Sequence, residues 1–177
     1  MLIARRVALK FALAAIPAAY ASTAFVSSAH AVDALPDARF VGWAQAHNDF
    51  EIASGQLALS RSGNEIVRGY ATRMIAEHTE AAQILVKSRA EAGVSYAPDP
   101  ASPPHTHAIL QRLSGLQGPE FDTAYANAQV GAQTDAVNQY GAYSQNGDNG
   151  TLRRYAQAMF PKAKEQLEYA KRMAGGR

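Results

Sequence analysis

The sequence predicts an all-α protein: an antiparallel four-helix bundle with a short extra helix between the second and third long helices. Four long stretches repeat apolar residues with the helical period of about 3.6 residues. Gly, Pro, Asn and Ser cluster between these stretches, and no segment alternates apolar and polar residues as a half-buried strand does. The composition is rich in Ala and Gln and sparse in β-branched residues, which favours helix. A chain of 177 residues suits one domain.

The first long helix is expected to begin at Asp37, which we predict as its N-cap, and to end at the turn formed by residues 62–64. Gly63 is expected to supply the C-terminal turn and Asn64 to cap the next helix. The predicted inner face of this first helix consists of Phe40, Trp43, Ala44, His47, Phe50, Glu51, Ser54, Leu57 and Ala58.

The second long helix is expected over residues 65–92, with Gly93 marking its C-terminal end. Residues 97–104 are rich in Pro and cannot be helical, so they form an extended connection. A short helix over residues 105–114 is expected to follow.

The third long helix is expected to begin at Pro119, which suits a first helical turn, and to end before the turn at residues 146–150. The fourth is expected over residues 151–173 and contains Pro161. The apolar period resumes after Pro161 without a change of phase, so this residue should bend the helix rather than end it.

Residues 1–31 are predicted to be a secretory signal peptide, which leaves residues 32–177 as the helical domain. A basic start is followed by a mildly apolar, Ala-rich run. Ala29 and Ala31 then occupy the two positions that a signal peptidase recognises. Cleavage is expected after Ala31, with a cut after residue 21 as the alternative. The protein is therefore expected in the periplasm or outside the cell.

The export route stays open, because residues 5–10 resemble the twin-arginine motif but lack the usual Ser before the arginine pair and the Phe after it. An uncleaved membrane anchor is disfavoured by Pro17 and by the many Ala and Ser residues of the segment. No stable membrane span is expected once the signal peptide is removed.

Charge and cysteine content exclude several classes of protein. Residues 1–31 hold three of the 17 Lys and Arg residues and none of the 15 Asp and Glu residues, so the predicted domain carries 14 basic against 15 acidic side chains. No segment of it forms a basic stripe, which argues against nucleic-acid binding. The chain has no Cys, so it can form neither a disulfide nor a lipid-modified N-terminal cysteine.

Each long helix carries one polar residue near the middle of its apolar face. In the second helix, His78 lies within about 60° of the apolar positions on the helical projection. The midpoints of packed helices lie at one height, so these side chains should converge in one layer of the core. The predicted layer consists of Glu51, His78, Gln133 and Gln166. An unpaired buried amide or carboxylate costs a few kcal/mol, so the layer implies mutual hydrogen bonds, trapped water or a ligand.

Three interpretations of this layer are open. In the preferred one it is a satisfied hydrogen-bonded core, in which Glu51 accepts from His78 and the two glutamines bridge the rest. In the second it is a divalent-metal site with Glu51 and His78 as ligands, to which His47 could add a third polar group. Two ligands are too few for a firm transition-metal site. In the third, one or both glutamines point outward; Gln133 is the weakest member, because Gln129 shares its face.

Other candidate groups have ordinary explanations. His105 and His107 have metal-site spacing but no third ligand nearby, so they are expected to be a solvated helix start. The charged residues of the second helix are expected to form a solvated face. No nucleophilic triad and no Gly-rich phosphate loop can be placed, so no catalytic residue is predicted and a divalent metal is the one cofactor considered.

The sequence resembles a large bacterial family of exported, ferritin-like domains of unknown function, whose members are often described as membrane or outer-membrane proteins. The resemblance covers about residues 40–173. It is carried by the order and spacing of Phe40-Val41, Glu51-Ile52, Leu57-Ala58, Ala71, Arg73-Met74-Ile75, His78-Thr79, Phe121-Asp122, Tyr125 and Leu167-Glu168-Tyr169-Ala170.

The resemblance implies a ferritin-like fold, but two departures count against iron storage or oxidase activity. Family members commonly have Glu and His at the positions of Glu51 and His78, and tend to have His where this chain has Gln133 and Gln166. Ile75 stands three residues before His78, so the chain also lacks the Glu-x-x-His pair of di-iron ferritins.

Two hypotheses on function follow. The first is a non-enzymatic exported helical bundle with a structural, stress-related or partner-binding role, whose partner would be an envelope protein or a second copy of the chain. The second is a metal-binding or redox ferritin-like protein with a reduced ligand set around Glu51 and His78.

Overall fold

The computed structural model describes residues 33–95 and 104–175. The predicted signal peptide and most of the Pro-rich connection lie outside these residues. Five helices form the described part of the chain, which contains no strand, and the predicted all-α bundle is confirmed. They are α1 (Asp37–Arg61), α2 (Glu65–Glu91), α3 (Pro104–Ser114), α4 (Gly118–Asn146) and α5 (Gly150–Ala174).

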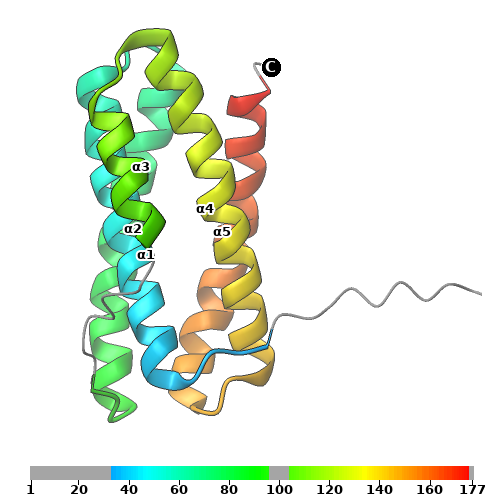
Figure 1. Ribbon diagram of the computed structural model, residues 1–177. Helices are drawn as coiled ribbons and strands as arrows, with labels where there is room; N and C mark the ends of the chain where they lie inside the picture. The colour runs from blue at the N-terminus through cyan, green and yellow to red at the C-terminus, as the bar shows by residue number, and fades with distance from the viewer. Residues whose placement is uncertain (1–32, 96–103, 176–177) are drawn as a thin grey trace, which may run out of the picture. The chain divides into compact units, whose positions relative to one another are not determined.

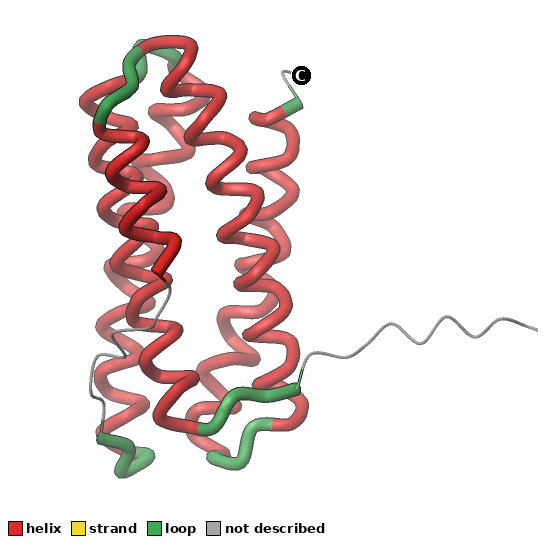
Figure 2. Tube along the Cα trace, viewed as in Figure 1, coloured by secondary structure: helices red, strands yellow, loops and turns green. Residues whose placement is uncertain are grey.

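The four long helices pack in a ring, in which α1 contacts α2 and α4, and α5 contacts the same two helices. Figure 1 shows that α1 and α5 run in one direction and α2 and α4 in the other, so every contacting pair is antiparallel. Because α2 and α4 are parallel, the chain must return along the bundle between them. The short helix α3 makes part of that return and packs against α1 and α4 (Figure 2).

Several of the predicted features of the helices and their ends are confirmed. The side chain of Asn64 caps α2 as predicted, accepting hydrogen bonds from the backbone amides of Ile66 and Val67. Gly93 has the left-handed conformation, with φ of 67°, which is the expected C-terminal signature of α2. The helix α5 continues through Pro161 without ending, as predicted.

Two predicted helix ends were wrong. Asp37 is not the N-cap of α1; that position is Pro36, and the Asp37 carboxylate instead accepts a hydrogen bond from the Tyr143 hydroxyl of α4. Gly63 does not have the left-handed conformation, because the chain already leaves α1 at the C-cap residue Ser62, which is extended with φ of −102° and ψ of 135°. The hydrogen bond from Tyr143 replaces the predicted N-cap role of Asp37. The extended conformation of Ser62 replaces the predicted glycine turn at the end of α1.

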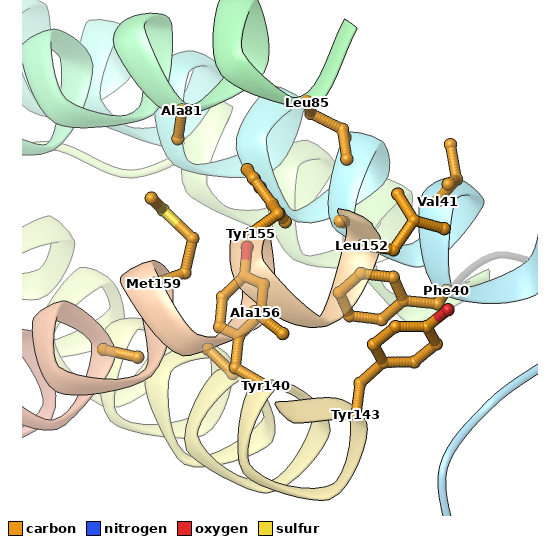
Figure 3. Packing of buried hydrophobic residues seen from close by; sticks show 13 residues of the cluster. Phe40, Val41, Ala81, Leu85, Tyr140, Tyr143, Leu152, Tyr155, Ala156 and Met159 are labelled. Atoms are coloured by element: carbon orange, nitrogen blue, oxygen red, sulfur yellow. The ribbon is translucent and has the colours of Figure 1, made fainter. Parts of the chain in front are cut away.

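The buried apolar residues form two clusters, one toward each end of the bundle. The first contains Phe40, whose ring stacks on Tyr143 with centroids 3.7 Å apart (Figure 3). The second contains Met74, Phe121 and Tyr125. On each long helix the two clusters are separated by buried polar side chains, which places a polar layer across the middle of the core.

Candidate functional site: a polar layer beside a small pocket

All four residues of the predicted layer are buried. The exposed fractions are 0% for Glu51 and Gln133, 3% for Gln166 and 5% for His78. Neither glutamine therefore points outward. On its own helix, each of the four residues lies between the buried apolar residues of one cluster and those of the other.

The hydrogen-bond partners differ from those expected. Oε1 of Glu51 accepts from Nε2 of Gln133 at 3.2 Å, which links α1 to α4. Nδ1 of His78 is 2.9 Å from Oδ1 of Asn48, which links α2 to α1. The expected bond between Glu51 and His78 is thus replaced by two separate pairs. Nε2 of Gln166 donates to Oε2 of Glu77 at 2.6 Å, so Gln166 is held toward the α2 side of the layer.

A third set of bonds enlarges the layer. The Gln129 amide donates to the Ser54 hydroxyl at 3.1 Å, and its carbonyl oxygen accepts from the Tyr70 hydroxyl at 3.2 Å. Gln129 was expected to compete with Gln133 for one face of its helix, but both side chains are fully buried. Asn48 was missed altogether, yet it lies three residues before Glu51 and so on the same face of α1.

Several polar atoms of the layer have no hydrogen-bond partner among the described residues. They are Nε2 of His47, Nδ2 of Asn48, Oε2 of Glu51, Nε2 of His78 and Oε1 of Gln133. A buried polar atom without a partner costs about 1–3 kcal/mol, so this layer lowers the stability of the core relative to a fully paired one.

Burial keeps the layer uncharged near neutral pH. It raises the pKa of Glu51 to about 8. It lowers the pKa of His78 to about 4, with a further contribution from the positive charge of Lys162. The pKa of His47 is also well below its ordinary value, because of burial and of the neighbouring His78. Glu51 is therefore mainly protonated at pH 7, and both imidazoles are neutral.

As the side chains lie, they do not fit a metal ion. No group of three or more His, Cys, Asp or Glu residues in the described parts of the chain is placed to hold one. Glu51 and His78 are each hydrogen-bonded to a neutral amide, from Gln133 and Asn48 respectively. The His47 ring meets His78 edge to face, with centroids 5.1 Å apart.

The other sequence candidates lie away from this layer. His107 is exposed on α3, and the side chain of His105 lies outside the described part. Glu77 differs from the solvated residue that was expected. It is only partly exposed and pairs with Arg73 at 2.7 Å as well as with Gln166.

A pocket of about 260 Å³ lies beside the layer, between α1, α3 and α4. Its lining residues are Trp43, His47, Phe50, Thr106, Ile109, Asn127, Ala128, Gly131, Ala132 and Asp135. Nε1 of Trp43 donates to Oδ2 of Asp135 at 2.9 Å, and the indole lies parallel to the His47 ring with centroids 5.4 Å apart. His47 is thus shared by the pocket wall and the layer. Asp135 was not predicted, because its role depends on a contact between helices distant in sequence.

None of the helices in the described ranges is both long enough and apolar enough to cross a lipid bilayer. The packing of the described helices defines the class of protein as a helical-bundle domain with a buried polar layer across its core. The chain belongs to the family described as Domain of unknown function (DUF4142), whose model matches residues 21–173. The predicted membership of a family of domains of unknown function is thereby confirmed. No curated protein and no solved structure matches the chain significantly.

Proposed function

We propose that this protein is an exported, non-enzymatic helical module of the bacterial cell envelope, with a structural, stress-related or partner-binding role. The observation that carries the proposal is the pairing within the polar layer. Glu51 and His78, the two best ligands, are each hydrogen-bonded to a neutral amide, from Gln133 and Asn48 respectively. Such pairing suits a hydrogen-bonded core better than a reactive centre.

Export is supported by the composition of residues 1–31, with their basic start, Ala-rich run and small residues at 29 and 31. We expect the protein recovered from the periplasm to begin at Val32. N-terminal sequencing checks this. An N-terminus at Ser22 would favour the alternative cleavage site, and intact Met1 on a membrane-bound protein would contradict cleavage.

The absence of a working metal centre is tested on protein exported with its own signal segment. Elemental analysis is expected to find no stoichiometric iron, zinc or manganese, and addition of each metal is expected to leave the melting temperature unchanged. One metal per chain, lost in Glu51→Gln but kept in the surface control Asp49→Asn, would contradict the proposal.

The cellular role is tested by deleting the gene and by crosslinking in intact cells. A module of this kind is expected to alter tolerance of envelope stress when it is lost, or to crosslink to an envelope protein or to a second copy of itself. Unchanged tolerance together with no crosslinked partner would remove the basis for an envelope role.

A metal-binding or redox ferritin-like protein is the second candidate. It is favoured by Nε2 of His47, Nε2 of His78 and Oε2 of Glu51, which lack partners within the described residues. The resemblance to exported ferritin-like domains adds to it. Binding would require these side chains to reorient and Glu51 to lose its proton, and the elemental analysis distinguishes this candidate from the first.

A further inference from the structure

The pocket between α1, α3 and α4 has a wall of mixed chemistry. Most of its lining is apolar, including Phe50, Ile109 and Ala128. Asp135 is the one acidic residue among the described lining residues, which include no Lys or Arg. An apolar cavity with a single carboxylate at its wall favours a cation over an anion, because opposite charges attract strongly where water is partly excluded.

The Asp135 carboxylate is positioned rather than free to turn. Its Oδ2 accepts the indole N–H of Trp43 at 2.9 Å, and the indole is in turn stacked on the buried His47 ring. The bond to Trp43 uses Oδ2, so Oδ1 of Asp135 is the carboxylate oxygen that a ligand amine would meet. A fixed carboxylate attracts an ammonium group and accepts a charge-assisted hydrogen bond from it.

We propose that this pocket binds a small apolar molecule that carries a protonated amine. The amine donates to Oδ1 of Asp135 beside the Trp43 ring, and the apolar body packs against Phe50, Ile109 and Ala128. The volume of about 260 Å³ lies below the range of about 300–1,000 Å³ typical of drug-sized ligands, so the ligand is limited to roughly one ring and a short chain.

Gly131 gives a way to close the pocket without disturbing the helix. It lines the pocket from α4, and a Cβ built at this position meets no atom within 4 Å. A larger side chain at residue 131 can therefore occupy the ligand volume without a backbone clash. Gly69 on α2 is a matched control, because a Cβ there also meets nothing within 4 Å and the residue is outside the pocket.

This inference goes beyond the proposed envelope role and does not depend on whether the layer binds a metal. Only His47 belongs to both regions. A failure of ligand binding would leave the metal analysis unaffected, and a stoichiometric metal at the layer would leave the pocket to be tested separately.

The test is calorimetric titration of the folded protein at pH 7 with three probes of similar size: 2-phenylethylamine, 2-phenylethanol and 3-phenylpropionate. We expect 2-phenylethylamine to bind with 1:1 stoichiometry and about tenfold more tightly than the neutral alcohol, with no binding of the carboxylate. Equal affinity for amine and alcohol, or no saturable binding of the amine, overturns the proposal.

Two pairs of variants locate the site. Asp135→Asn keeps an acceptor for Trp43 but removes the charge, and is expected to weaken amine binding about tenfold, whereas Asp49→Asn has no effect. Gly131→Leu is expected to abolish binding, whereas Gly69→Leu leaves it unchanged. Amine binding that survives in both Asp135→Asn and Gly131→Leu, with both variants folded by circular dichroism, contradicts a site at this pocket.

Discussion

At the scale of single residues, the unusual feature is a set of ionisable side chains that burial holds neutral. His78 depends on Asn48 for the hydrogen bond at Nδ1, and both side chains are buried. The pair links α1 to α2 in the middle of the bundle, between the two apolar clusters. The hydrogen bond itself adds little to the free energy of unfolding. Leaving Nδ1 of His78 unpaired in the core would cost more.

Replacing Asn48 by Leu tests this cost, because Leu has a similar branched shape but cannot accept from His78. Loss of the acceptor leaves Nδ1 of His78 unpaired, whereas loss of the unpaired Nδ2 of Asn48 offsets part of that cost, so we expect the free energy of unfolding to fall by about 1 kcal/mol. Urea denaturation measures it. Asp49→Leu, on the neighbouring exposed position, is the control and should change stability by about 0.5 kcal/mol or less. An equal effect of the two substitutions would mean that the Asn48 bond contributes nothing.

At the scale of the helices, α1 packs tightly against α2 at Gly55. A Cβ at this position would lie 2.8 Å from Cγ1 of Ile75 and 3.2 Å from the carbonyl oxygen of Ala71. The absence of a side chain at Gly55 therefore permits this close contact between the two helices. The exposed Gly69 on α2 has no such neighbour, so its flexibility only lowers helix stability.

Gly→Ala substitutions at these two positions should act in opposite directions. Gly69→Ala is expected to raise the free energy of unfolding by about 0.5–1 kcal/mol through helix propensity. Gly55→Ala is expected to lower it, because the backbone oxygen of Ala71 cannot move aside without shifting α2. Thermal unfolding followed by circular dichroism measures both, and stabilisation by Gly55→Ala would show that the two helices separate easily.

Much of the helical architecture could be predicted from local patterns. The apolar period located the four long helices, and Asn64 and Gly93 marked the ends of helices because their signals act within a few residues. Asp37 was misassigned because its partner, Tyr143, lies 106 residues away in the sequence. Local chemistry favoured a cap there, and a tertiary contact took its place.

The candidate site was predictable in its position but not in its pairing. Periodicity identified Glu51 and His78 as polar residues on apolar faces, and both are buried. It could not show that His78 bonds to Asn48 or that Glu51 bonds to Gln133, because partners are decided by small rotations of packed helices. The pocket beside Trp43 was not predicted for the same reason.

At the scale of the whole domain, three buried ionisable groups should shape the dependence of stability on pH. The pKa of Glu51 is raised from 4.5 to about 8, so the unfolded chain loses this proton first and stability falls as pH rises between those values. The pKa of His78 is lowered from 6.5 to about 4, so the unfolded chain gains this proton first and stability falls as pH decreases below 6.5. His47 acts in the same direction as His78.

The free energy of unfolding is therefore expected to be greatest near pH 6.5. Above that pH only Glu51 contributes a slope, and below it the two histidines together outweigh Glu51. Urea denaturation from pH 4 to pH 9 checks the profile. Stability that rises steadily from pH 6.5 to pH 9 would be inconsistent with a buried, protonated Glu51.

A neutral hydrogen-bonded layer and a centre built around an ionised carboxylate differ in how the charge of Glu51 affects stability. The most direct measurement compares the free energy of unfolding of Glu51→Gln with that of the unaltered protein at pH 5 and pH 8. Gln is neutral at both pH values and keeps an oxygen that can accept from Gln133. The stability of the variant relative to the unaltered protein should therefore increase by about 3 kcal/mol from pH 5 to pH 8. A difference that does not change with pH would mean that Glu51 is ionised in the folded state, as a metal ligand would be, and would contradict a neutral layer.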